Sequence, residues 1–107
     1  MPRKKPLDRV RAFALSHPEA YEEETWGHPT FRVNKKMFAA AGDESMSCKA
    51  DPDERPALTT RPWFFEPPYV ARHGWVGVRF EAVDDWDEVG ELIETAYRMT
   101  APKRLLR

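Results

Sequence analysis

Residues 31–49, FRVNKKMFAAAGDESMSCK, decide the fold that this chain is expected to adopt. The apolar runs FRV and KMFAAA are separated by Asn34-Lys35, which has the composition of a short break. A Gly-Asp-Glu run at 42–44 then favours a hairpin turn into SMSCK. Short strands joined by short turns predict an antiparallel meander in this half of the chain.

The stretch TWGHPTF, which ends at Phe31, precedes this meander and is either a site or a tight corner between two strands. Residues 20–26 lead into it and predict a strand with an exposed acidic face. Gly27 permits backbone angles that other residues avoid, and Pro29 cannot donate to a strand ladder. We therefore predict a corner here, with Trp26 and Phe31 in the buried core.

Three segments carry helix signals. Residues 7–16 have apolar side chains at helical spacing. A second helix is expected to start at Asp51, and Pro56 either restarts it or keeps it short. Asp85 and Glu88 have the spacing of a capping box at the start of a third helix. The apolar stripe of that helix consists of Trp86, Val89, Ile93, Ala96 and Tyr97.

The segment between the last two helices contains the apolar run at 63–65 and a strand at 75–80, with a turn at His73-Gly74 before the strand. Alternation along the strand separates Val76, Val78 and Phe80, which are expected in the core, from Trp75, Gly77 and Arg79. The order is helix, about three strands, helix, about two strands, helix. It predicts one two-layer α+β domain over residues 1–107, built on an antiparallel sheet.

Composition narrows the function classes. The 107 residues carry a net charge of −1, but 1–11 and 98–107 are each at +4, while 12–97 is at −9. The basic footprint of a nucleic-acid binder is therefore concentrated at the termini. One cysteine fits a reducing compartment, and neither a signal peptide nor a membrane span is evident. We expect a cytoplasmic protein that is not associated with a membrane.

Motifs for catalysis or metal binding are absent from the sequence. His17, His28 and His73 do not have a zinc spacing, and Cys48 has neither a partner cysteine nor a local histidine base. Two acidic groups, 22–24 and 84–88, could bind a divalent cation if the first strand and the last helix lay side by side. The simpler interpretation is a solvated strand face and a helix start that suits the dipole. We expect no metal, no cofactor and no enzymatic activity.

Basic residues follow the expected turns and lie close to aromatic ones. They are Arg32, Lys35, Lys36, Lys49, Arg72 and His73, with Trp75 beside the last two. Cations and aromatic rings on projecting hairpins can hold phosphates and stack on bases. Alternatively, short basic hairpins are solvated edges that discourage strand pairing.

Three stretches, WGHPTFRVNKKMFA at 26–39, PYVARHGWVGV at 68–78 and IETAYRMTAPKRL at 93–105, agree in order and spacing with a known pattern. Together they resemble the MmcQ/YjbR family of small bacterial proteins. Pro56 and the doubled Pro67-Pro68 depart from the family pattern. The resemblance implies a CyaY-like or secretion-chaperone-like fold in the order α-β-β-β-α-β-β-α.

The family is often described as DNA-binding, through two projecting strand pairs that act as a double wing. On this chain the wings would be the turns around Asn34-Lys35 and Arg72-His73. The residues expected to contact DNA, by phosphate binding or base stacking, are Arg32, Lys35, Lys36, Arg72, His73, Trp75, Lys103 and Arg104, with Tyr69 as a second stacking candidate.

Two other functions stay open on the sequence. A protein- or peptide-binding adaptor would use an apolar sheet face or a free strand edge, as secretion chaperones do. A small-molecule pocket near Trp26, Arg32 and His73 is the third. The expected partners are therefore DNA or a protein, and the chain is expected to be a monomer or a weak homodimer.

Overall fold

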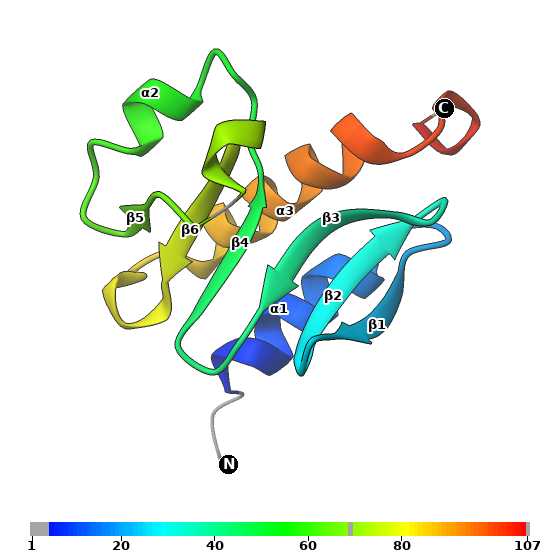
Figure 1. The fold of residues 1–107 in the computed structure, drawn as a ribbon, viewed down its shortest axis with the longest axis horizontal. Coiled ribbons are helices and arrows are strands. Elements are labelled where there is room, and N and C mark those ends of the chain that lie inside the picture. Colours follow the sequence, from blue (N-terminus) through cyan, green and yellow to red (C-terminus); the bar gives the residue numbers. More distant parts are fainter. Residues whose placement is uncertain (1–4, 69, 107) are drawn as a thin grey trace.

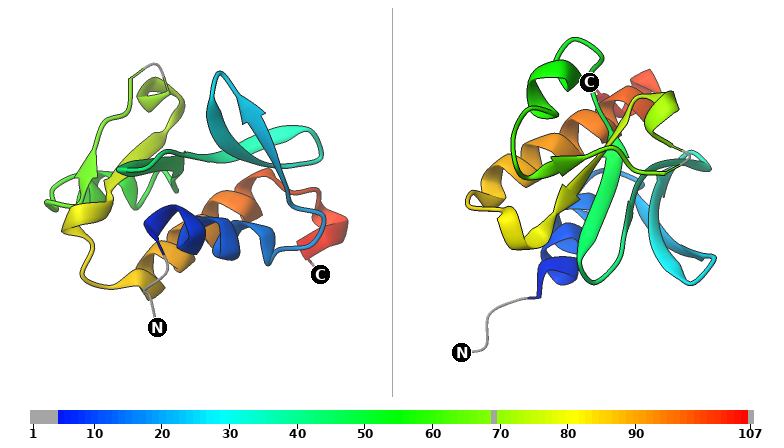
Figure 2. Two further views of the ribbon diagram at one scale, coloured as in Figure 1. Left: turned by 90° about the horizontal axis from the view of Figure 1, so that it is seen from below. Right: turned by 60° about the vertical axis from the view of Figure 1, so that its left-hand side comes forward.

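Six strands form one antiparallel sheet in the order β1-β2-β3-β4-β6-β5, and two long helices, α1 and α3, cover one of its faces (Figures 1 and 2). The computed structural model describes residues 5–68 and 70–106. The elements are α1 Pro6–Leu15, β1 Tyr21–Thr25, β2 His28–Val33, β3 Lys36–Ala41, β4 Ser45–Lys49, α2 Arg55–Leu58, β5 Phe64–Phe65, η1 Ala71–His73, β6 Trp75–Arg79, η2 Phe80–Ala82, α3 Trp86–Thr100 and η3 Lys103–Leu106.

The predicted α+β class with an antiparallel sheet is confirmed, but four strands precede α2 where the predicted order had three. The additional strand exists because Thr25 pairs with His28, so that the chain reverses in two residues and β2 begins at once. Pro29 therefore lies inside β2 and not in the corner. It is tolerated because β3 pairs with β2 only from Thr30 onward, which leaves Pro29 beside β1 alone.

Two tight turns close the first two hairpins. Trp26 and Gly27 have φ angles of 52° and 80°, and Asn34 and Lys35 have φ angles of 52° and 66°. Two consecutive positive φ angles are typical of the type I′ turn, whose twist matches that of the flanking strands. Gly27 and Asn34 suit this conformation, whereas Trp26 is a bulky residue in a region that bulky residues avoid.

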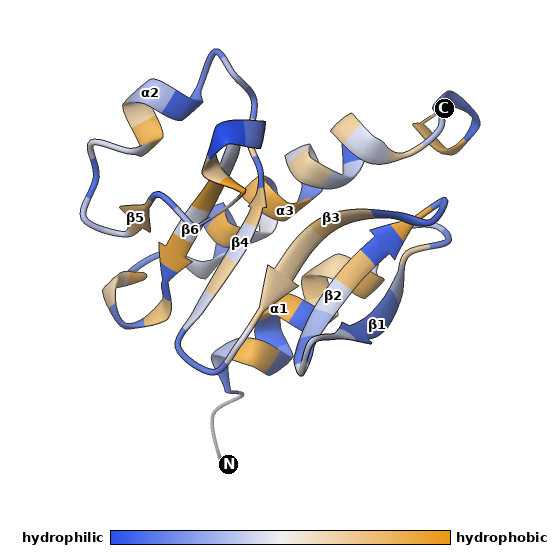
Figure 3. Cartoon of the chain, viewed as in Figure 1, coloured by the Kyte–Doolittle hydropathy of each residue, from blue (hydrophilic) through white to orange (hydrophobic). Residues whose placement is uncertain are grey.

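The core lies between the sheet and the helices. Phe31 is fully buried, as predicted, and Cys48 is a buried strand residue that is separated from it in the sheet by Ala39 of β3. The hydropathy colouring in Figure 3 shows apolar segments on the strands and on both helices. The large buried side chains that the helices contribute are Val10, Val89, Leu92, Ile93 and Tyr97. This core fixes α1 and α3 on one face of the sheet, and the two helices do not cover the opposite face.

The helix ends differ in part from expectation. Asp85 caps α3 by accepting a hydrogen bond from the Asp87 amide at 3.1 Å. Glu88 does not complete the capping box, because its carboxylate forms an ion pair with Arg61. The second helix begins at Arg55 and not after Asp51, because residues 52–54 form a turn. It is one turn long and starts next to Pro56, so it matches both expected forms in part. Within 5–68 and 70–106, every helix is too short or too polar to traverse a bilayer.

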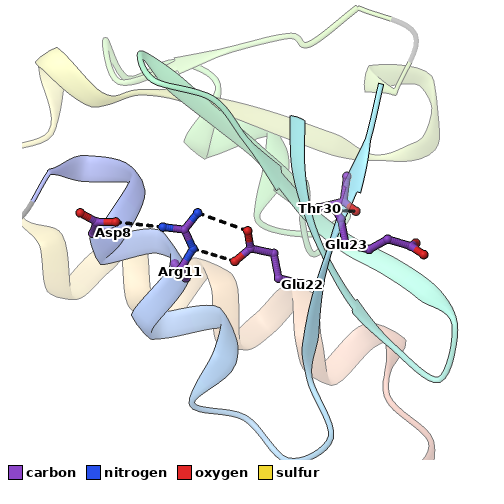
Figure 4. A network of polar contacts seen from close by, with 5 residues as sticks. All are labelled: Asp8, Arg11, Glu22, Glu23 and Thr30. Atoms are coloured by element: carbon purple, nitrogen blue, oxygen red, sulfur yellow. Dashed lines mark hydrogen bonds and ion pairs between the residues drawn. The ribbon is translucent and has the colours of Figure 1, made fainter. Parts of the chain in front are cut away.

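Consecutive glutamates of β1 are used on opposite faces of the sheet. Glu22 accepts from Arg11 of α1 at 2.6 Å, and Arg11 also contacts Asp8 at 2.9 Å. The side chain of Glu23 points to the other side (Figure 4). The backbone oxygen of Glu23 accepts a hydrogen bond from the Thr30 hydroxyl at 2.6 Å. The acidic face predicted for this strand is therefore divided between the helix layer and the open face.

Candidate binding groove

A row of small side chains crosses the open face of the sheet. The strand registers place Thr30, Ala40, Ser47, Gly77 and Phe65 next to one another on five adjacent strands. A Cβ atom added at Gly77 would lie 2.4 Å from Cζ of Phe65, so the Phe65 ring lies directly over the glycine. Thr30, Ala40 and Ser47 remain as a low surface, which we call the floor.

Two walls rise from the floor on the side of the sheet away from α1 and α3 (Figure 2, left). The hairpin wall, at the β1–β2 turn, consists of Thr25, Trp26 and His28, and the proline wall, before η1, consists of Phe65, Pro67, Pro68 and Val70. The groove between them has a volume of about 390 Å³. Its other described lining residues are Thr30, Met37, Ala40, Ala41, Gly42, Ser45, Met46 and Ser47. Of all these, His28 alone is titratable.

Trp26 is the most exposed large apolar residue described, at 95% of its full accessibility. The prediction that it lies in the core is wrong. A two-residue turn places its first residue at the tip of the hairpin, where no second layer of structure can cover it. The sequence contained a signal for this, because a residue followed by glycine between two strands is typical of such turns.

The proline wall is held by Arg79. Its guanidinium lies 5.0 Å from the centre of the Phe65 ring and donates to the Phe64 carbonyl at 2.7 Å. The cation thus fixes the ring that covers Gly77. Sequence reasoning did not select this wall, although the doubled Pro67-Pro68 had been noted as a departure from the family pattern.

Arg32, one of the expected phosphate ligands, supports the hairpin wall through contacts within its own strand pair. Its Nε lies 2.9 Å from a carboxylate oxygen of Glu23 and 3.2 Å from Thr30 Oγ1, and its Nη2 donates to Thr25 Oγ1 at 3.2 Å. Its side chain is also half-buried. Phosphate binding by Arg32 would compete with these contacts. Sequence alone could not reveal the contacts with Glu23 and Thr25, because these two residues come from another strand.

Two more of the expected DNA contacts are occupied or hidden. Arg104 forms a two-point contact with Glu19, at 2.7 and 2.9 Å. Trp75 faces away from the core as predicted, but it is only 4% exposed. Its ring therefore cannot stack on a base unless the structure around it rearranges. Tyr69, the other stacking candidate, lies outside the described residues.

Five expected contacts are exposed, and they lie in three separate places. Lys35 and Lys36 are at the β2–β3 turn, Arg72 and His73 are in η1, and Lys103 is in η3 (Figure 1). The expected second wing is the long connection between the paired strands β5 and β6, and η1, a single turn of 3₁₀ helix, lies within it. The two basic turns are thus not neighbours, since β3 and β4 lie between β2 and β6 in the sheet.

A second, wider depression adjoins the groove and shares Ser45 and Phe65 with it. Its volume is about 620 Å³, and its lining contains three acids, Asp43, Glu44 and Glu81, together with Arg79. Because these three carboxylates outnumber the single guanidinium, the local charge is negative. This part of the surface repels phosphate.

The potentially reactive side chains are used structurally. Burial raises the pKa of the Cys48 thiol to about 12, so the thiolate is not populated near neutral pH. His17 stacks on Tyr97 with ring centres 4.6 Å apart, and burial lowers its pKa. Tyr97 donates to the Pro18 carbonyl at 2.6 Å. Across the part of the chain that the structure describes, His, Cys, Asp and Glu nowhere gather in a group of three suited to a metal ion.

The third sequence hypothesis, a pocket formed by Trp26, Arg32 and His73, is only partly reproduced. Trp26 lines the groove, but Arg32 and His73 are not among its lining residues. The groove floor is instead supplied by residues of β2, β3 and β4 that the sequence analysis had not considered.

The fold and groove define a small α+β protein with one sheet face packed on helices and the other face open. The chain belongs to the YjbR family, whose model matches residues 15–99. The Deinococcus radiodurans protein DR2400, a DUF419-domain protein, has a similar crystal structure, with a TM-score of 0.77 at 20% identity over 89% of this chain and 78% of that one.

A protein from Pseudomonas syringae is also similar in structure, with a TM-score of 0.73 at 18% identity over 94% of this chain and 99% of that one. At such identities the likeness concerns the fold. A search of curated proteins found no match.

Proposed function

We propose that this protein is a non-enzymatic adaptor that binds an apolar segment of a partner protein in the groove between the hairpin wall and the proline wall. The observation that carries this proposal is the exposed Trp26 indole at the rim of an uncharged apolar groove. A large aromatic residue that is absent from the core and projects beside such a groove is typical of a binding surface.

The lining selects the chemistry of the ligand. Met37, Phe65, Pro67, Pro68 and Val70 contribute apolar side chains to the lining, and hydroxyl groups of Thr30 and Ser47 lie on the floor. A phosphate or carboxylate placed here would lose its hydration without gaining a cation, which is costly. An apolar side chain loses no such hydration, and the flexible side chain of Met37 can adapt to it.

The groove is a better site than the free edge of β1, which is the strand-addition mode considered from the sequence. The sheet ends at β1, but three consecutive glutamates, 22–24, occupy this edge strand. Charged residues on an edge strand discourage the addition of another strand. The floor and walls, by contrast, offer buried apolar contact.

A displayed library of random peptides tests the proposal. Wild type is expected to enrich apolar sequences, with binding that changes little between low and physiological salt. Ser47→Lys places a charge on the floor and is expected to abolish this binding, whereas Lys35→Glu/Lys36→Glu, outside the groove, is expected to retain it. Circular dichroism checks whether Ser47→Lys is folded. If this variant is unfolded, Val70→Lys in the proline wall takes its place. Absence of enrichment, or equal binding by the groove variants, contradicts the proposal.

DNA binding is the second candidate, and one observation favours it. The exposed cations Lys35, Lys36 and Lys103 carry no ion pair within the described part of the chain. Fluorescence anisotropy with labelled single- and double-stranded DNA tests it, at low and at physiological salt. Phosphate contacts predict affinity that falls steeply with salt. They also predict loss in Lys35→Glu/Lys36→Glu and retention in Arg98→Glu, a charge reversal on the exposed side of α3. No binding at low salt excludes this function.

A further inference from the structure

Trp26 adds no stability to the folded chain through its side chain and lowers its stability through its backbone. Its indole is 95% exposed, so it contributes no buried area to the core. Its φ angle of 52° lies in the left-handed region, which costs a residue other than glycine about 1–2 kcal/mol. Strain at an exposed position points to a function outside the folding of the single chain.

The structure that could receive this indole lies on the same face of the same molecule. The groove begins at the foot of the hairpin wall and is apolar along its length. Trp26 lines the rim of the groove but is 95% exposed, so the indole does not fill the groove of its own chain. A projecting knob beside a matching hole is self-complementary under a two-fold rotation, which is the commonest arrangement in homodimers.

Charge favours the same pairing. Glu22 and Glu23 are neutralised by Arg11 and Arg32, whereas Glu24 is exposed on the hairpin and has no ion pair among the residues described. Across the groove, η1 presents an exposed Arg72 directly after the proline wall. If the hairpin of one copy enters the groove of another, an exposed anion on the hairpin would meet a surface that carries an exposed cation beside the groove.

We propose that two copies of this chain pair face to face, each placing its Trp26 indole in the groove of the other. The dimer rests on the proposed function only in that both use the groove, and a bound peptide would have to displace the indole. Each indole buries about 150–250 Å². With the two hairpin tips, the interface stays at the low end of the range for specific complexes, about 1,200 Å² or less. The pairing is therefore expected to dissociate on dilution.

Sedimentation velocity over a concentration series tests the pairing. The sedimentation coefficient of wild type is expected to rise with concentration, and that of Trp26→Ala is expected to stay at the monomer value. Trp26→Ala should fold normally because the indole touches little. A wild type that is monomeric at every concentration, or a Trp26→Ala variant that associates as strongly, overturns the proposal.

Charge exchange separates this dimer from other modes of association. Glu24→Arg and Arg72→Glu are each expected to weaken the dimer at least several-fold, and the double variant is expected to restore most of it. Two single variants that change nothing overturn the proposed orientation. The peptide-binding experiment gives an independent result, since a monomeric protein that enriches apolar peptides retains the proposed function without the dimer, and a dimer without peptide binding does the reverse.

Discussion

Replacing Trp26 by asparagine should stabilise the protein. Asparagine followed by Gly27 is a preferred sequence for a type I′ turn, because asparagine tolerates the left-handed region. Since the indole is 95% exposed, its removal sacrifices almost no buried area. Relief of a backbone cost of about 1–2 kcal/mol should raise the free energy of unfolding by about 1 kcal/mol. For a chain of this size, that corresponds to a rise in Tm of about 4 °C or more.

The matched control is Trp26→Ala, which removes the same side chain but keeps a residue that disfavours the left-handed region. Urea unfolding of both variants, at concentrations where wild type is monomeric, compares the backbone effect with the loss of the indole. We expect asparagine to be clearly more stable than alanine, and alanine to be close to wild type. A loss of 1 kcal/mol or more in both variants would refute the reasoning, because it would mean that the indole packs within its own chain.

Three further predictions concern the interior. Gly77→Ala should destabilise the fold by about 1–3 kcal/mol in urea unfolding, because its Cβ would overlap the Phe65 ring; an unchanged midpoint would show that the ring moves freely. The Tm should fall as pH drops below 6.5, since burial lowers the pKa of His17 and the unfolded chain then binds the proton more readily. His17→Phe, which keeps a ring against Tyr97, should lose that part of the dependence, and an unaltered profile would assign it elsewhere. Cys48 should react with a thiol reagent only as fast as the protein opens, so rapid labelling of the native protein would contradict its burial.

Local patterns in the sequence predicted most of the fold. The runs 36–41 and 45–49 coincide with β3 and β4, because apolar stretches of strand length were bounded by turn residues. The helices at 7–16 and from Asp85 onward were also found, since helical spacing and a capping residue act within a few positions. The prediction for Trp26 fails because a large aromatic side chain is usually buried. The turn lies at Trp26 and Gly27, one position before the predicted corner, and it exposes the indole.

The candidate site was much less predictable. Arg32 looked like a free cation, but Glu23 and Thr25, which contact it, become its neighbours only through the β1–β2 pairing. Trp75 was assigned to the correct side of its strand and is nevertheless buried. The groove combines strands with a loop before η1, and no local spacing indicates such a combination. Partners that are distant in sequence are set by the tertiary fold.

The strand order also determines when during folding the groove can exist. Strands β1 to β4 follow one another through short turns, so their pairings close small loops and can form early. The pairing of β4 with β6 must wait for residues 50–74 to be placed, and the proline wall arrives with β5 beside β6. A nascent or partly unfolded chain would therefore present the Trp26 hairpin without the groove, and groove binding would report that the last strands have docked.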